Sequence, residues 1–207
     1  MIRHAFLTLA LTLSVVAWSA PASALDARDQ ADIGRIERYL NAITTLRSKF
    51  IQRASTGNIA SGTVYISRPG KMRFEYDPPA PILLVADGIF LIYVDKDLEQ
   101  ISHVPISSTP ISVLVSENVS LTESHDIAAV ARGPGTVSVT LTMKSDPEAG
   151  AVRLLFTDAP LALKQWYIRD AQGVEVRVSL LDPERGAELD SGLFQVNPNM
   201  FARQSNN

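Results

Sequence analysis

Hydrophobic and polar residues alternate with a period of two over most of the chain, from about Lys49 almost to the C-terminus. This alternation is typical of antiparallel strands that have one apolar face and one solvated face. It is clearest in residues 63–66, 71–76, 137–143 and 174–180. Clusters of Gly, Pro, Asp and Ser separate these stretches. The spacing predicts roughly 9–11 strands, as in a sandwich or barrel.

The segment from Asp26 to Phe50 has a different period. Ile33, Ile36 and Leu40 recur at helical spacing, and charged residues occupy the other side. We expect an amphipathic helix that packs on a core and is capped by Asp26 or Asp29. A helix that binds a membrane surface is the alternative, but its polar face would be rich in Lys and Arg.

Two further segments interrupt the alternation. Thr109 and Pro110 precede the apolar residues 111–115, which predicts a short helix with Thr109 as its cap and Pro110 at its first position. Residues 82–85 and 89–94 are apolar on both faces, so we expect at least one pair of strands that is covered on both sides. The chain is therefore predicted to be a mainly β (α+β) domain with two helical pieces.

The N-terminal residues predict export. Arg3 and His4 precede an apolar run from Ala5 to Val16, and the run is followed by Ala22-Ser23-Ala24. This order is typical of a signal peptide, and the run is shorter than a permanent bilayer span. We expect a signal peptide at residues 1–24 and a single domain at residues 25–207. The residue after the predicted cleavage site is Leu25, which cannot carry the lipid anchor that a cysteine accepts.

Composition excludes several classes of function. The 207 residues include 19 Lys and Arg against 22 Asp and Glu, a formal charge of -3. Nucleic acid recognition favours a basic protein, so no nucleic acid partner is expected. The absence of cysteine excludes disulfides, thiolate nucleophiles and metal sites built on thiolates.

Motifs for catalysis and metal binding are also missing. The chain has no Gly-x-Ser-x-Gly pattern, and neither His103 nor His125 has a second histidine four residues later. Residues 95–99 begin like a calcium loop, but Gln100 and Ile106 replace the glycine and the glutamate that such a loop needs. A catalytic triad assembled from distant positions remains open. We expect no enzyme activity, no metal and no cofactor.

The block from Gly62 to Tyr76, followed by Pro79 and residues 82–88, resembles the signature of the LolA family. Members of this family are periplasmic carriers of outer-membrane lipoproteins. Weaker similarity continues through residues 93–100, 109–110, 161–173 and 189–194.

The resemblance implies an unclosed antiparallel β-barrel with a helical lid over its concave apolar face. It also implies that Arg68, in the Arg-Pro turn, is a lid latch, meaning a residue whose hydrogen bonds hold the lid closed. The expected acyl-chain cavity is lined by Met72, Phe74, Tyr76, Leu84, Leu91 and Tyr93. The expected lid residues are Ile33, Ile36, Leu40, Ile111 and Leu114.

By the same resemblance, the protein is expected to be a monomeric periplasmic chaperone that shields the acyl chains of lipoproteins. It would receive them from an inner-membrane ABC lipoprotein-releasing transporter and deliver them to an outer-membrane acceptor. The alternatives are a lipid- or lipoprotein-sensing regulatory protein of the same fold, the outer-membrane acceptor itself, and an enzyme acting on lipid.

Overall fold

The computed structural model describes residues 25–197 and residue 201. The predicted signal peptide, residues 1–24, lies outside the described residues. The described part contains one α-helix, eleven strands and four 3-10 helices. The helices are α1 (Ala27–Asn41), η1 (Ile106–Ser108), η2 (Pro110–Leu114), η3 (Pro147–Ala149) and η4 (Ser191–Phe194). The strands are β1 (Thr45–Ala54), β2 (Ile59–Ser67), β3 (Lys71–Tyr76), β4 (Ile82–Asp87), β5 (Phe90–Asp95), β6 (Gln100–Pro105), β7 (His125–Gly133), β8 (Thr136–Met143), β9 (Gly150–Thr157), β10 (Ala162–Asp170) and β11 (Glu175–Arg185).

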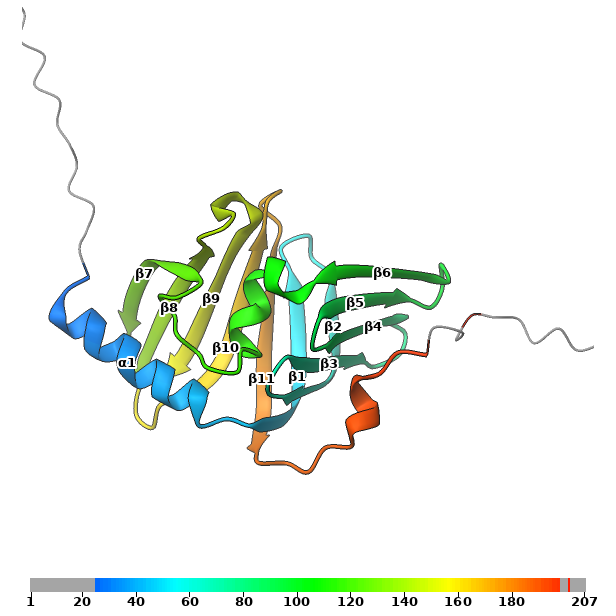
Figure 1. Ribbon diagram of the computed structural model, residues 1–207, viewed down its shortest axis with the longest axis horizontal. Helices are drawn as coiled ribbons and strands as arrows, with labels where there is room; N and C mark the ends of the chain where they lie inside the picture. Colours follow the sequence, from blue (N-terminus) through cyan, green and yellow to red (C-terminus); the bar gives the residue numbers. More distant parts are fainter. Residues whose placement is uncertain (1–24, 198–200, 202–207) are drawn as a thin grey trace, which may run out of the picture.

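All eleven strands form one antiparallel sheet, in the order β6-β5-β4-β3-β2-β1-β11-β10-β9-β8-β7. The sheet curves strongly, and its end strands, β6 and β7, lie at opposite sides of the molecule (Figure 1). The predicted class, a mainly β protein with an unclosed antiparallel barrel of 9–11 strands, is confirmed.

The concave face of the sheet is covered by α1 and by the segment that contains η1 and η2 (Figure 1). Helix α1 begins with a capping box, in which the backbone N–H of Asp29 donates to Oδ1 of Asp26 over 2.7 Å. Its residues Ile33, Ile36 and Leu40 are buried against the sheet, as their spacing predicted. The largest hydrophobic core therefore lies between the sheet and these covering segments.

The prediction that the helix extends to Phe50 is wrong. Helix α1 ends at Asn41, and residues 45–54 form β1. Leu46, Ser48 and Phe50 alternate inward on β1, and each is at most 2% exposed. The middle residue is polar, and its hydroxyl donates to the carbonyl of Leu181 over 2.8 Å. This buried serine concealed the period of two, while Leu46 and Phe50 also fit a helical spacing.

The predicted short helix at residues 110–114 is a 3-10 helix with Pro110 at its start. The predicted cap is wrong, because the side chain of Thr109 makes no capping hydrogen bond. Its hydroxyl instead donates to the carbonyl of Ile106 over 2.7 Å, which stabilises the turn between η1 and η2.

A second, smaller core lies on the other face of β4 and β5. It consists of Leu83, Val85, Ile92 and Val94, and Val196 and Phe201 of the C-terminal segment pack against it. That segment, orange to red in Figure 1, runs along this half of the sheet. The backbone carbonyl of Leu193 in η4 accepts a hydrogen bond from Arg73 on β3 over 3.1 Å. The prediction of strands covered on both faces is thus confirmed for β4 and β5.

Candidate functional site

The six side chains predicted to line a cavity share the concave face of the sheet. The pairing register places Phe74 opposite Leu84, and Leu84 opposite Tyr93. In the next row, Met72 is opposite Ala86, and Ala86 is opposite Leu91. Tyr76 follows Phe74 by two residues and therefore points to the same side of β3. The structure brings these side chains together, and their role in binding stays a prediction.

These residues differ in exposure. Met72 and Phe74 are 1% and 4% exposed, whereas Tyr93 is 39% exposed, and Tyr76, Leu84 and Leu91 are half-buried. The face therefore has a covered centre and an accessible rim on β5.

An aromatic cluster occupies the centre of the concave face. The ring of Phe74 lies 5.2 Å from that of Phe50 and 6.0 Å from that of Trp166, both in edge-on geometry. Phe50 also contacts Tyr76 edge-on at 5.2 Å. The residue pattern did not predict Phe50 and Trp166 at this site, because β1 and β10 bring them to this face from distant positions. Strand alternation around Trp166 could have indicated that its side chain points to this face.

A groove with a volume of about 660 Å³ lies where β1 ends and β2 begins, beside the loop after β3. Its lining includes Gln52, Ala60, Pro79 and Ile82. Next to it, the hydroxyl of Tyr76 donates to Oε1 of Gln52 over 2.7 Å, and burial raises the pKa of Tyr76 to about 12. The phenol is therefore neutral at ordinary pH. The volume lies within the range of about 300–1,000 Å³ that small-molecule sites occupy.

The predicted lid residues all face the sheet. Their exposed fractions lie between 0% and 7%, and all belong to the core cluster that contains Met72 and Phe74. They are Ile33, Ile36, Leu40, Ile111 and Leu114. The apolar side chains of α1 and η2 thus occupy the surface that an apolar ligand would need.

Arg68, which directly follows β2, joins the two covering segments. Its guanidinium donates to the carbonyls of Leu40 and Ile43 at the C-terminal end of α1, the latter over 3.2 Å. It also donates twice to the carbonyl of Ser116 after η2, over 2.8 Å and 2.6 Å. Carbonyls at a helix C-terminus carry partial negative charge, which favours a cation there. Burial lowers the pKa of Arg68, and these carbonyl acceptors carry no formal charge.

A second set of polar contacts connects the N-terminal part of α1 to the sheet. Asp32 is 6% exposed and accepts from Nε of Arg35 and from Nε of Arg132 on β7, each over 2.7 Å. Arg132 also pairs with Asp29 over 2.9 Å, and Arg35 with Asp158 in the turn between β9 and β10. No pattern in the sequence predicted this cluster.

Arg132→Gln is expected to loosen the N-terminal part of α1, because it removes the cation between Asp29 and Asp32. We expect a melting temperature lower by about 2–4 °C and faster amide exchange in residues 29–36. Thermal melts and hydrogen exchange measure both. Arg38→Gln is the control, since Arg38 is exposed on the same helix and forms no ion pair within the described residues. Equal exchange in the two variants would contradict a role for Arg132 in holding α1.

The described residues contain no cluster of three or more His, Cys, Asp or Glu that could bind a metal ion. His125 is buried, neither of its ring nitrogens has a partner, and burial lowers its pKa. His103 is exposed and contacts Phe90 edge-on. Over the same residues, every helix is too short or too polar to cross a bilayer.

Comparisons with known proteins match this architecture. A family model described as "Outer membrane lipoprotein carrier protein LolA" matches residues 41–197. An outer-membrane lipoprotein carrier protein of Legionella pneumophila is 28% identical over 171 residues, covering 79% of this chain and 84% of that one. The corresponding protein of Alkalilimnicola ehrlichii is 28% identical over 213 residues, covering 93% and 88%. A crystal structure of a DUF1329 family protein from Desulfovibrio piger shares the fold, with a TM-score of 0.50 at 10% identity, covering 81% of this chain and 96% of that one.

Proposed function

This chain belongs to the LolA family of outer membrane lipoprotein carrier proteins, and we propose that it carries lipoproteins with their acyl chains held against the concave face. The observation that supports this most directly is the cover on that face. Its apolar centre is filled by side chains of α1 and η2, and Arg68 joins both segments, mainly through backbone carbonyls. In this proposal the protein is a chaperone and performs no catalysis.

Acyl chains require such a cover because water excludes them. Each buried methylene stabilises a bound chain by about 0.8 kcal/mol, so a chain of about sixteen carbons gains on the order of 12 kcal/mol. A carrier must also release its cargo. Because α1 and η2 compete with the acyl chain for the same surface, closing the lid opposes binding and makes release possible.

In the proposed cycle, the acyl-binding residues are Met72, Phe74, Tyr76, Leu84, Leu91 and Tyr93. The cargo comes from an inner-membrane ABC lipoprotein-releasing transporter and passes to an outer-membrane acceptor. The protein acts as a monomer in the periplasm. We assign the energy for loading to the transporter, because a periplasmic carrier has no access to ATP.

Export predicts a specific mature N-terminus. If residues 1–24 are a signal peptide, the exported protein begins at Leu25. Intact-mass analysis of periplasmic material is expected to give the mass of residues 25–207. A periplasmic protein that retains residues 1–24 would contradict the assignment.

The carrier function is tested by incubating the purified protein with spheroplasts that contain the cognate transporter and a triacylated lipoprotein. We expect the lipoprotein to appear in the supernatant in a complex with this protein. An acyl-chain probe, such as a fluorescent fatty acid, should bind the protein without spheroplasts. A protein that neither releases lipoprotein nor binds the probe would refute the proposal. One that binds the probe but releases nothing would favour a lipid-sensing protein of the same fold.

A further inference from the structure

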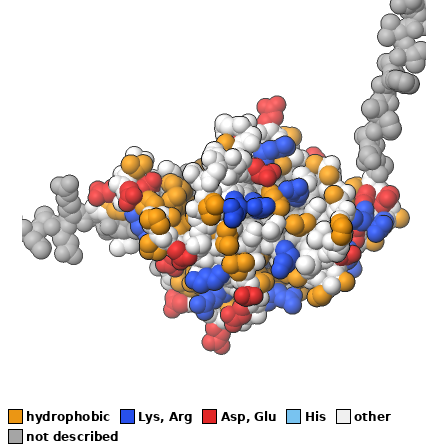
Figure 2. All heavy atoms as spheres, turned by 180° about the vertical axis from the view of Figure 1, so that it is seen from behind, with side chains coloured by type: hydrophobic (Ala, Val, Ile, Leu, Met, Phe, Trp, Pro, Cys, Tyr) orange, Lys and Arg blue, Asp and Glu red, His pale blue; other side chains and the backbone are white. Residues whose placement is uncertain are grey.

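A row of side chains crosses the convex face of the sheet, away from α1 and η2. It consists of Arg53 on β1, Arg177 on β11, Tyr167 on β10 and Arg153 on β9, each directly opposite the next in the pairing register. We call these four residues the basic row. Lys and Arg side chains are spread over the middle of this face (Figure 2). With adjacent strands about 4.8 Å apart, the row is roughly 14 Å long.

The basic row places two like charges side by side, and Glu175 is the carboxylate that lines the same hollow. Arg53 and Arg177 are direct neighbours across β1 and β11, and like charges in this arrangement destabilise a sheet. Within the described residues, neither side chain forms an ion pair or a hydrogen bond. Arg169, which is exposed beside the row and opposite Glu175 in the pairing register, likewise has no ion pair within the described residues. The chain as a whole carries a charge of -3, so this concentration of arginine does not follow from composition.

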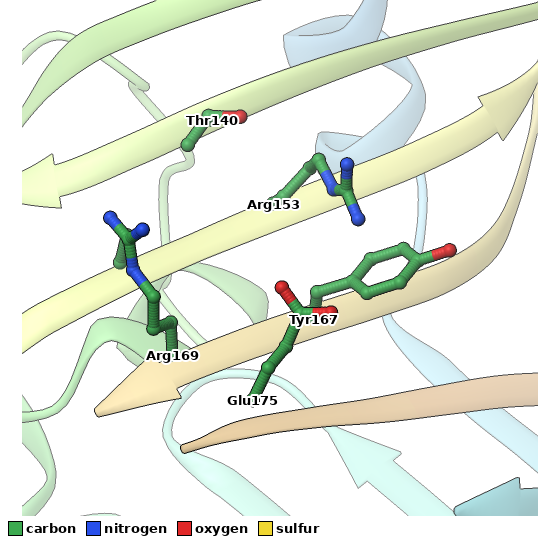
Figure 3. A pocket seen from close by; sticks show the side chains of 6 residues that line it. Thr140, Arg153, Tyr167, Arg169 and Glu175 are labelled. Carbon is green, nitrogen blue, oxygen red and sulfur yellow. The ribbon is translucent and has the colours of Figure 1, made fainter. Parts of the chain in front are cut away.

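Two hollows lie along the row. One, of about 170 Å³, is lined by Thr140, Arg153, Tyr167, Arg169 and Glu175, and the other, of about 250 Å³, by Arg53, Tyr167, Glu175, Arg177 and their neighbours. The hollows share Tyr167 and Glu175. Figure 3 shows the first, where the guanidinium of Arg153 lies over the ring of Tyr167, 3.8 Å from its centroid. This stacking orients a planar guanidinium and leaves its N–H groups available to a ligand.

We propose that the basic row is a docking site for an extended acidic segment of a partner protein. Guanidinium groups bind carboxylates through paired hydrogen bonds, and each such pair would offset the repulsion between Arg53 and Arg177. An extended chain advances about 3.3 Å per residue, so the row accommodates about four or five residues with carboxylates at every second position. The site lies opposite the concave face, so this docking is an addition to the carrier function.

The shape of the face favours a peptide over a membrane. The convex curvature (Figure 1) would let a flat bilayer touch only a few residues at a time. Each basic residue in contact adds about 1 kcal/mol to membrane attachment, so a strong membrane site needs many of them at once. Arg153 and Arg177 are half-buried beside the hollows, so their guanidinium groups do not project far from the sheet. An extended segment can follow the hollows across the strands.

The site is tested with a fluorescein-labelled octapeptide of alternating Glu and Thr, titrated by fluorescence anisotropy. We expect saturable binding that weakens as NaCl is added, and no binding of a Gln-Thr peptide. Arg177→Gln and Arg153→Gln should each weaken binding about two- to fivefold, while Arg28→Gln on α1 should not. Glu175→Gln removes a carboxylate beside the row, so it should tighten binding. Arg177→Gln should also raise the melting temperature, which separates its effect from misfolding.

Binding that is absent, or insensitive to Arg177 and Arg153, would overturn the proposal. So would a Glu175→Gln variant that binds the acidic peptide more weakly. Flotation with vesicles containing phosphatidylglycerol, if it depends on these arginines while the peptide does not bind, would instead identify a membrane site. Sedimentation showing a dimer that depends on Arg177 would identify a second copy as the occupant. The assay contains no lipoprotein, so its failure would leave the carrier function untouched.

Discussion

Replacing Arg68 with leucine is expected to shift the lid towards its open form while leaving the sheet intact. The variant loses the hydrogen bonds to the carbonyls of Leu40, Ile43 and Ser116. Hydrogen bonds to a charged group contribute about 1.5–3 kcal/mol each, so the open population should rise about tenfold or more. Hydrogen exchange should accelerate in α1 and in residues 110–117, and the strands should keep their protection.

The same variant should fail in transfer. With lid closure weakened, the acyl chain meets less competition for the concave face, so the variant should accept lipoprotein but pass it on poorly. Arg68→Lys keeps the positive charge but lacks the planar guanidinium with its several N–H donors, so its transfer activity should be intermediate. Arg47→Leu, at an exposed arginine on the convex face of β1, is the control. If Arg68→Leu shows wild-type transfer and unchanged exchange in α1, Arg68 is only a turn residue.

A carboxylate on the concave face should lower stability by an amount that depends on its position. The row formed by Phe74, Leu84 and Tyr93 allows two positions to be compared. Phe74 and Tyr93 both pair with Leu84, but they are 4% and 39% exposed. Phe74→Glu buries an unpaired charge within the aromatic cluster, which costs several kcal/mol. We expect a melting temperature lower by about 10 °C, with part of the penalty relieved by lid opening.

Tyr93→Glu is the matched variant. Its charge remains in contact with water, so its stability should change by no more than about 0.5 kcal/mol. Both variants should lose affinity for a fluorescent fatty acid, because a charge would then face the acyl chain. A Tyr93→Glu protein that binds the fatty acid as tightly as the wild type would remove β5 from the proposed site. If Phe74→Glu unfolds completely, Tyr93→Glu and the milder Phe74→Leu still test the face.

Local patterns in the sequence predicted most of the sheet but not its boundary with α1. Residues 137–143 alternate cleanly, and β8 buries Val137, Val139, Leu141 and Met143 as expected. On β1 the inward position between Leu46 and Phe50 is Ser48, and a polar residue there conceals the alternation. Its hydroxyl is satisfied by a carbonyl of β11, which only the folded sheet supplies.

Polar contacts between distant segments could not be predicted from one sequence. Asp32 and Arg132 are 100 residues apart, and β7 brings them together only after the sheet curves beneath α1. The juxtaposition of Arg53 and Arg177 likewise depends on the register between β1 and β11. For Arg68, the family resemblance indicated a contact with the lid, and the structure supplies the carbonyls that it bonds.

The strand order also determines when each strand of the growing chain can find its neighbours in the sheet. Strand β1 can pair with β2 as soon as both have been synthesised, but its other neighbour, β11, is the last of the eleven described strands to be made. Until then an inner strand of the finished sheet has an open edge, and such edges promote aggregation. The charged side chains of Arg47, Lys49 and Arg53 on β1 discourage that association. Completion of this sheet must therefore wait for residues 175–185, and β1 has to remain soluble throughout the delay.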